Sequence, residues 1–236
     1  MNPVTTLGST RSTHPKDVRK DPPIPFEGVE AGVSPMYCPV SDEPCEAFMS
    51  IMDNEVVEHL CRWTNERAAI YLGGNRKKKV NGLLWKDLDP KTLYLYFALV
   101  FNMGVVKYPR VAMYWSQDPV YGGPKVFTHK VMSRNLFSNI TKFLRFSSPA
   151  DVDKDDPKTR IEPFLDLLRP RCQNMLNPGL HIAVDEALIL WKGRLKFKQF
   201  IRTKRSRFGI KVFLTCPGHK DWQVRTIILY FLKFMK

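Results

Sequence analysis

The chain has 236 residues, of which 44% are hydrophobic and 12% aromatic, so it can form a hydrophobic core and is not disordered as a whole. Its 37 Lys and Arg outnumber 23 Asp and Glu, and the net charge of +14 favours a polyanionic partner, nucleic acid before membrane. Five scattered cysteines without a CxxC pair predict a reducing compartment, with neither a zinc site nor a disulfide framework. The sequence has no apolar signal segment and no apolar stretch long enough to span a bilayer, so we expect a soluble intracellular protein.

The first third of the chain changes from a polar leader to a helical pattern. Residues 1–45 are rich in Pro, Ser, Thr and charge without periodicity, so we expect a disordered leader. From Glu46 the spacing becomes helical, with an N-cap signal at Asp53-Asn54. The apolar face of this helix is formed by Val56, Val57, Leu60 and Trp63. A basic loop, GGNRKKKVNG (73–82), follows. Its lysines either contact phosphate or are solvated, and solvation is the commoner outcome for a short charge run.

The middle of the chain predicts two further helices. Asp89 before Pro90 marks a helix start, and the sequence that follows, TLYLYFALVFNMG, is apolar on nearly every side. We therefore expect a central core helix that ends at Gly104. After a turn-rich stretch with Tyr114 and Trp115 as packing anchors, Ser133 caps the next helix. Its apolar face is formed by Phe137, Ile140, Phe143 and Leu144.

The polar loop 147–160 holds four aspartates but lacks the Gly and the distal Glu of an EF-hand, so we expect a solvated hinge. A helix over 161–176 follows and completes a helical domain over 46–178. Beyond Gly179 the period changes to alternation, and the stretches 181–190, 209–216 and 223–232 predict three consecutive strands of an antiparallel meander. The fold class is therefore α+β, helices first and then the opening of a sheet over 179–236.

The first predicted strand contains the pair Asp185-Glu186, and a run of nine cations follows it. The cations are Lys192, Arg194, Lys196, Lys198, Arg202, Lys204, Arg205, Arg207 and Lys211. A carboxylate held on a strand suits Mg²⁺ or Mn²⁺ for phosphoryl transfer, but an acidic pair at a strand edge is more often solvated. Neither His181 nor His219 has a second ligand at a helical or strand spacing, and no phosphate loop or nucleophile motif occurs.

The segment VDEALILWKGRLKFKQFIRTKRSRFGIKVF (184–213) resembles the start of the catalytic domain of piggyBac-type transposases and their transposable-element-derived relatives. It shares their Asp-Glu pair, a K/R-G-R step at 192–194 and the segment RFGIK at 207–211. Upstream, Thr64-Asn65, MGVVKYP, Tyr114-Trp115-Ser116, VMSR and EPFLDLL extend the resemblance from about residue 46 to about residue 225.

The resemblance implies a helical dimerisation and DNA-binding domain over 46–178, followed by the N-terminal part of a ribonuclease-H-like domain over 179–236. It makes Asp185 the first of three aspartates that coordinate two Mg²⁺ or Mn²⁺ ions in the family, while Glu186 is not one of them. It places the basic run near transposon-end DNA. Only 51 residues follow Asp185, and Asp221 lies too close to it to replace a later aspartate, so we expect a truncated core that binds metal weakly.

The leading hypothesis is a nuclear, piggyBac-derived DNA-binding protein without transposase activity of its own. Two alternatives stay open. One is an active DNA transposase or nuclease that uses two divalent metals. The other is an interaction module that forms a homodimer or pairs with a full-length relative. None of the three involves a membrane or zinc.

Overall fold

The computed structural model describes residues 32–34, 43–75, 78–118, 130–177, 182–191, 193, 198–202 and 207–217, with the backbone alone at 32–33, 176–177, 182–187 and 212–217. The helices are α1 (Pro44–Ile51), α2 (Asn54–Leu72), α3 (Pro90–Val105), α4 (Arg134–Phe143) and α5 (Glu162–Met175), with the 3-10 turns η1 (Val111–Trp115) and η3 (Pro157–Arg160). The strands are β1 (Gly32–Val33), β2 (Lys79–Val80), β3 (Leu83–Leu84), β4 (Leu176–Asn177), β5 (Ile182–Leu190), β6 (Gln199–Phe200) and β7 (Phe208–Pro217).

The helix starts follow from capping side chains, as predicted. The Asp53 carboxylate accepts a hydrogen bond from Val56 N at 3.0 Å, and Asp89 accepts one from Thr92 N at 2.9 Å. Ser133 Oγ accepts one from Leu136 N at 3.2 Å. Each cap satisfies a backbone N–H that has no partner within its own helix. The helical pattern that begins at Glu46 comprises two helices: α1 ends at Ile51, and α2 begins after the predicted cap Asp53.

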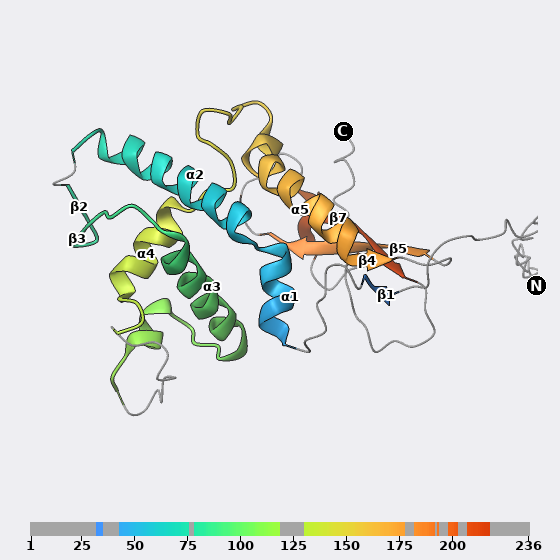
Figure 1. Cartoon of the computed structure of the whole chain (residues 1–236), viewed down its shortest axis with the longest axis horizontal. Helices are drawn as coiled ribbons and strands as arrows, with labels where there is room; N and C mark the ends of the chain where they lie inside the picture. The colour runs from blue at the N-terminus through green and yellow to red at the C-terminus, as the bar shows by residue number, and fades with distance from the viewer. Residues whose placement is uncertain are drawn as a thin grey trace, which may run out of the picture.

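The core lies where α2, α3 and α4 pack together (Figure 1). Its fully buried side chains include Val56, Leu60, Leu93, Leu99 and Ile140. Tyr114 and Trp115 are buried as well, which confirms them as packing anchors.

Helix α3 differs from the predicted central core helix. Only Leu93, Tyr96 and Leu99 are buried on it, whereas Phe101 is 56% and Val105 84% exposed. The helix packs on α2 and α4 through one face. Phe48 of α1 packs edge-to-face with Phe101, with ring centroids 5.4 Å apart, and the rest of the other apolar face stays open among the described residues. An apolar helix buries only those faces that a neighbouring element covers, so composition alone overestimated the burial. Its end, at Val105, lies one residue beyond the predicted Gly104.

The basic loop after α2 forms a hairpin. Strands β2 and β3 pair antiparallel around Asn81 (φ 49°) and Gly82 (φ 78°), which are two left-handed residues as a tight hairpin turn requires. The buried Asn139 of α4 holds this hairpin, because its Nδ2 donates to Val80 O and its Oδ1 accepts from Asn81 Nδ2, both at 2.8 Å.

The C-terminal sheet has the strand order β5–β7–β6, with β7 antiparallel to both neighbours. The first two predicted strands are confirmed as β5 and β7. The short strand β6 was not predicted, because two residues carry no visible alternation. The third predicted strand, 223–232, lies outside the described residues. Figure 1 shows β5 and β7 on the side of the molecule where α5 lies, away from the β2–β3 hairpin.

The segment expected as a disordered leader contains an exception. Gly32 and Val33 pair antiparallel with Asn177 and Leu176, and Ser34 N donates to Met175 O at 2.8 Å. Helix α1 also begins at Pro44, before the expected boundary. A two-residue strand paired with residues more than a hundred positions away leaves no local signal, so composition could not reveal it.

Candidate nucleic-acid interface

The acidic pair lies on β5, within a ribbon of nine residue pairs between β5 and β7. The ribbon runs from Ile182 opposite Pro217 to Leu190 opposite Gly209, and it places Asp185 opposite Leu214 and Glu186 opposite Phe213. The backbone positions of both acidic residues are thereby defined. A strand paired along its whole length holds its residues rigidly, as a binding site requires.

Gly209 sits where the three strands meet, because it lies opposite both Leu190 of β5 and Gln199 of β6. A Cβ atom at this position would lie 2.3 Å from the carbonyl oxygen of Ile189. Any other residue would push the strands apart, since such a contact is far shorter than van der Waals distance. Strand pairing therefore requires glycine at position 209 of the RFGIK segment.

The described parts of the basic run lie at the end of the sheet where β7 begins. Ile201 N donates to Arg207 O at 2.8 Å and closes the connection between β6 and β7. Trp191 N donates to Phe208 O at 3.3 Å, so the segment after β5 starts at the same end. The Phe200 and Phe208 rings pack at a tilt, with 4.8 Å between their centroids, and hold β6 on β7. We call 191–211, with its cations, the basic hairpin.

Four of the nine predicted cations are described. Arg202 and Arg207 are exposed, while Lys198 and Lys211 are half-buried. Lys198 Nζ lies 5.4 Å from the centroid of the Phe208 ring and donates to Gly193 O at 3.3 Å. Within the described ranges, Lys198, Arg202 and Arg207 form no ion pair with an acidic side chain. The other five lie outside the described residues: Lys192, Arg194, Lys196, Lys204 and Arg205.

Candidate metal ligands do not converge in the described part of the chain, where no three His, Cys, Asp or Glu side chains could hold one ion. Two aspartates of the polar loop serve the backbone instead. Asp153 accepts from Asp155 N at 2.8 Å, and Asp156 accepts from Lys158 N at 3.1 Å. His181, His219 and Asp221 lie outside the described residues.

Two of the described cysteines, Cys61 and Cys172, are not activated as nucleophiles. Burial, with smaller contributions from the charges of Asp89 and Glu58, raises the pKa of Cys61 to about 12. Burial also raises the pKa of the Cys172 thiol. Because the thiolate is the reactive form, both side chains stay protonated at neutral pH.

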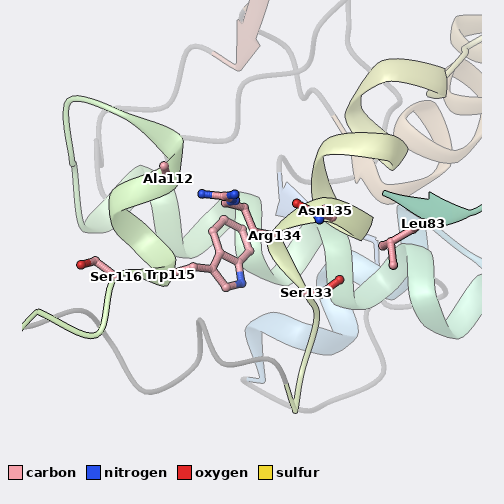
Figure 2. Close-up of a pocket in the computed structure, with 7 residues that line it drawn as sticks. All are labelled: Leu83, Ala112, Trp115, Ser116, Ser133, Arg134 and Asn135. Atoms are coloured by element: carbon pink, nitrogen blue, oxygen red, sulfur yellow. The ribbon is translucent and has the colours of Figure 1, made fainter. Parts of the chain in front are cut away.

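A cavity of about 490 Å³ lies between η1 and the start of α4 (Figure 2). Trp115, Ser133, Arg134 and Asn135 contribute to its lining. Ser133 Oγ caps α4, and the Trp115 indole N–H donates to Met132 O at 2.9 Å. Arg134 is the one charged side chain among the described lining residues, so the cavity offers no acid–base pair.

Several residues that carry the upstream resemblance hold the helical region together. Thr64 Oγ1 accepts a hydrogen bond from Arg145 N at 3.3 Å. The Asn65 side chain accepts from Leu88 N at 2.7 Å and donates to Leu88 O at 3.0 Å. These side chains satisfy backbone groups between helices, a structural role rather than a chemical one.

Sequence reasoning missed one group of cations. It considered Lys77–Lys79 as an isolated run, whereas the structure places Lys78 together with Lys142 of α4 around the Tyr71 ring. The spacing of Arg67 and Tyr71, four residues apart on a helix, was the only sequence signal for such a cluster.

Comparison with known proteins identifies the family. The family model described as Transposase IS4, of the piggyBac type, matches residues 43–224, more than half of the chain. The chain belongs to the piggyBac-type transposase family.

Two human relatives of this piggyBac-type chain are each 27% identical to it over 184 residues, which is 76% of the chain. They are PiggyBac transposable element-derived protein 3 and the Chimeric ERCC6-PGBD3 protein. The match spans 28% of the length of the first and 16% of the second.

The fold is similar to that of a piggyBac transposase in a cryo-EM structure of a synaptic complex with hairpin DNA. The TM-score is 0.62 and the identity 24%, over 80% of this chain and 39% of that one. This likeness shows the mixed helix-and-sheet fold of the family. No helix within the described ranges combines the length and the apolarity needed to cross a bilayer.

Proposed function

We propose that this member of the piggyBac-type family is a nuclear DNA-binding protein that contacts duplex DNA through the basic hairpin. The observation that carries the proposal is the gathering of cations at one end of the sheet, where Arg202 and Arg207 are exposed and form no ion pair within the described ranges. Cations held on a paired backbone lose little conformational freedom when they bind phosphate. The structural neighbour is a piggyBac transposase in a complex with hairpin DNA, which supports the same partner class.

Each part of the chain has a role in the proposed function. Residues 46–178 form a helical dimerisation and DNA-binding domain, and residues 179–236 form the N-terminal part of a ribonuclease-H-like domain. The order of five helices before the antiparallel β5–β7 ribbon, within the described ranges, supports this division. The likeness to a piggyBac transposase over 80% of the chain supports it as well.

For the metal, Asp185 is the proposed ligand. Two-metal phosphoryl transfer needs several carboxylates around ions about 3.5–4 Å apart. Asp185 and Glu186 are adjacent on a strand, where successive side chains point to opposite faces, so only one of them can serve a given metal pair. A divalent ion bound by one carboxylate keeps most of its waters and binds weakly. We therefore propose DNA binding without strand cleavage by this chain alone.

The DNA-binding proposal is tested by substituting Lys198, Arg202, Lys204 and Arg205 with alanine. Because each cation that neutralises a phosphate releases counterions, the slope of log affinity against log salt should shrink by about 0.9 per lost contact. Fluorescence anisotropy with a labelled duplex over a salt series measures both quantities. A variant lacking the exposed Lys86, Lys91, Lys107 and Arg110 removes the same charge from the helical region and is the matched control. Equal affinity and slope in the wild type and the hairpin variant would contradict the proposal.

A second candidate function is an interaction module, and the open apolar face of α3 favours it. Leu95, Phe101 and Val105 are exposed there, the last at 84%. An apolar helix face of this kind fits a second copy of the chain or a full-length relative.

A further inference from the structure

A group of cations surrounds Tyr71 near the end of α2. Figure 1 shows the end of α2 and the β2–β3 hairpin at one side and the strands β5 and β7 at the other. The group consists of Tyr71 with Arg67 on α2, Lys78 before β2, and Lys142 and Arg145 at the end of α4. We call these five residues the Tyr71 cluster.

Packing between α2 and the end of α4 brings the cluster together. Arg145 N donates to Thr64 Oγ1 at 3.3 Å, one helical turn before Arg67. The Tyr71 and Phe143 rings lie 5.3 Å apart between centroids, one turn beyond Arg67. Because side chains four residues apart lie on one helix face, Arg67 and Tyr71 present a common surface toward α4.

The Tyr71 ring positions two ammonium groups. Lys142 Nζ lies 3.9 Å and Lys78 Nζ 4.6 Å from the ring centroid, both within cation–π range. Lys78 Nζ also donates to Tyr71 O at 3.4 Å. Both lysines are exposed to solvent, so the ring orders their charges without covering them.

The positive charges lack compensating acids. Among the described residues, none of the four cations forms an ion pair, and the nearby Glu66 carboxylate accepts a hydrogen bond from Ser148 Oγ at 2.8 Å. Burial lowers the pKa of the Arg145 guanidinium, and the positive charges of Arg67 and Arg160 lower it further. Like charges held together cost free energy that a bound polyanion would recover.

We propose that the Tyr71 cluster is a second surface for the phosphodiester backbone of DNA, an inference that rests on the proposed DNA-binding function. Guanidinium groups donate paired hydrogen bonds to phosphate oxygens, and the ordered ammonium groups act as point charges beside them. Contacts of this kind position a duplex without reading its sequence. DNA bound at both surfaces is held at two separate places on the protein.

The test is a variant with Arg67→Ala, Lys78→Ala and Lys142→Ala. Its matched control is Lys91→Ala, Lys107→Ala and Arg110→Ala, which removes the same net charge from exposed positions outside the cluster. In anisotropy titrations with a labelled duplex, the cluster variant should bind about tenfold more weakly than the wild type at about 0.1 M salt, and its salt slope should shrink by about 2–3. The control should stay within about twofold of the wild type. Substituting Arg67→Lys, Lys78→Arg and Lys142→Arg should restore the slope.

A measurement on the wild type makes the outcome independent of variant folding. Amine acetylation read by mass spectrometry should show Lys78 and Lys142 protected by the duplex, with Lys91 and Lys107 unchanged. Equal reactivity of Lys78 and Lys142 with and without DNA would overturn the inference. If the basic-hairpin variant alone loses binding, the proposed function stands and this inference fails. If the cluster variant alone loses binding, the inference stands and the basic hairpin is not the interface. A wild type that binds no duplex overturns both.

Discussion

Single buried polar side chains decide several local arrangements in this protein. Asn139 is 1% exposed, and its amide makes hydrogen bonds to both Val80 and Asn81 of the β2–β3 hairpin. Removing such a side chain leaves a buried carbonyl without a partner, which costs about 1–3 kcal/mol. Lys78 of the Tyr71 cluster directly precedes this hairpin. By holding the hairpin, the Asn139 amide also restrains the backbone next to Lys78.

At the residue scale, the proposed role of Asp185 leads to a prediction about Asp185→Asn. The change removes one negative charge from β5 and leaves the pairing of that strand with β7 intact, because the backbone makes it. Duplex affinity should therefore stay equal to that of the wild type or rise slightly. Neither protein should nick supercoiled DNA in Mg²⁺ or Mn²⁺, as a single carboxylate does not hold two ions. Agarose gels of a plasmid assay measure this. Metal-dependent nicking that disappears in Asp185→Asn would restore the transposase alternative.

At the scale of elements, an ion-pair network joins α5 to the start of α2. Arg171 Nε donates to the Asp53 carboxylate at 2.7 Å and Arg171 Nη2 to Glu55 Oε2 at 2.6 Å. Asp53 therefore caps α2 and binds α5 at once. Arg171 is only 14% exposed in its side chain, so this contact is less screened by water than a typical surface pair.

We predict that Asp53→Asn and Arg171→Gln are energetically coupled. Burial would raise the pKa of Asp53, but the hydrogen bonds from Arg171 and Val56 N outweigh it, so the net pKa lies below its ordinary value of 3.8. A carboxyl with a lowered pKa stabilises the fold above its unfolded-state pKa, and that stability is lost as pH falls through the folded-state pKa. Urea unfolding should give a coupling energy of about 1 kcal/mol at neutral pH, and it should vanish in strong acid.

The pair Arg169–Asp166 on α5 provides the matched control for this cycle, because both of its side chains are more than a third exposed. Its coupling should be within about 0.5 kcal/mol of zero. Equal coupling in the two pairs, or a coupling at Asp53 that persists in acid, would contradict the assigned role.

For the whole molecule, the open α3 face predicts self-association. Val105 is 84% exposed, so Val105→Glu should leave the monomer folded while placing an unpaired charge in a dimer interface. Sedimentation velocity should show the wild type dimerising with concentration and the variant remaining monomeric. Leu84→Glu, at a residue 55% exposed on β3, is the matched control and should dimerise as the wild type does. A monomeric wild type at every concentration would remove self-association from the proposed functions.

The sequence by itself determined those features that depend on neighbouring residues. Asp53, Asp89 and Ser133 were correctly predicted as helix caps because each binds a backbone N–H only three residues away. The strands β5 and β7 were predicted from alternation, and the resemblance of 184–213 to piggyBac-type transposases pointed to the family that the comparison then showed.

Only the tertiary structure decided which distant residues meet. The β1–β4 pairing and the tie between Asp53 and Arg171, 118 residues apart, depend on how whole elements pack. The same holds for the open face of α3, since a residue is buried only where another element covers it. Tyr71 was an ordinary helical residue in the sequence, and the packing of α2 against α4 made it the centre of a cation cluster. Contacts between segments far apart in the chain have no local signature, because their free energy arises only after the chain has folded.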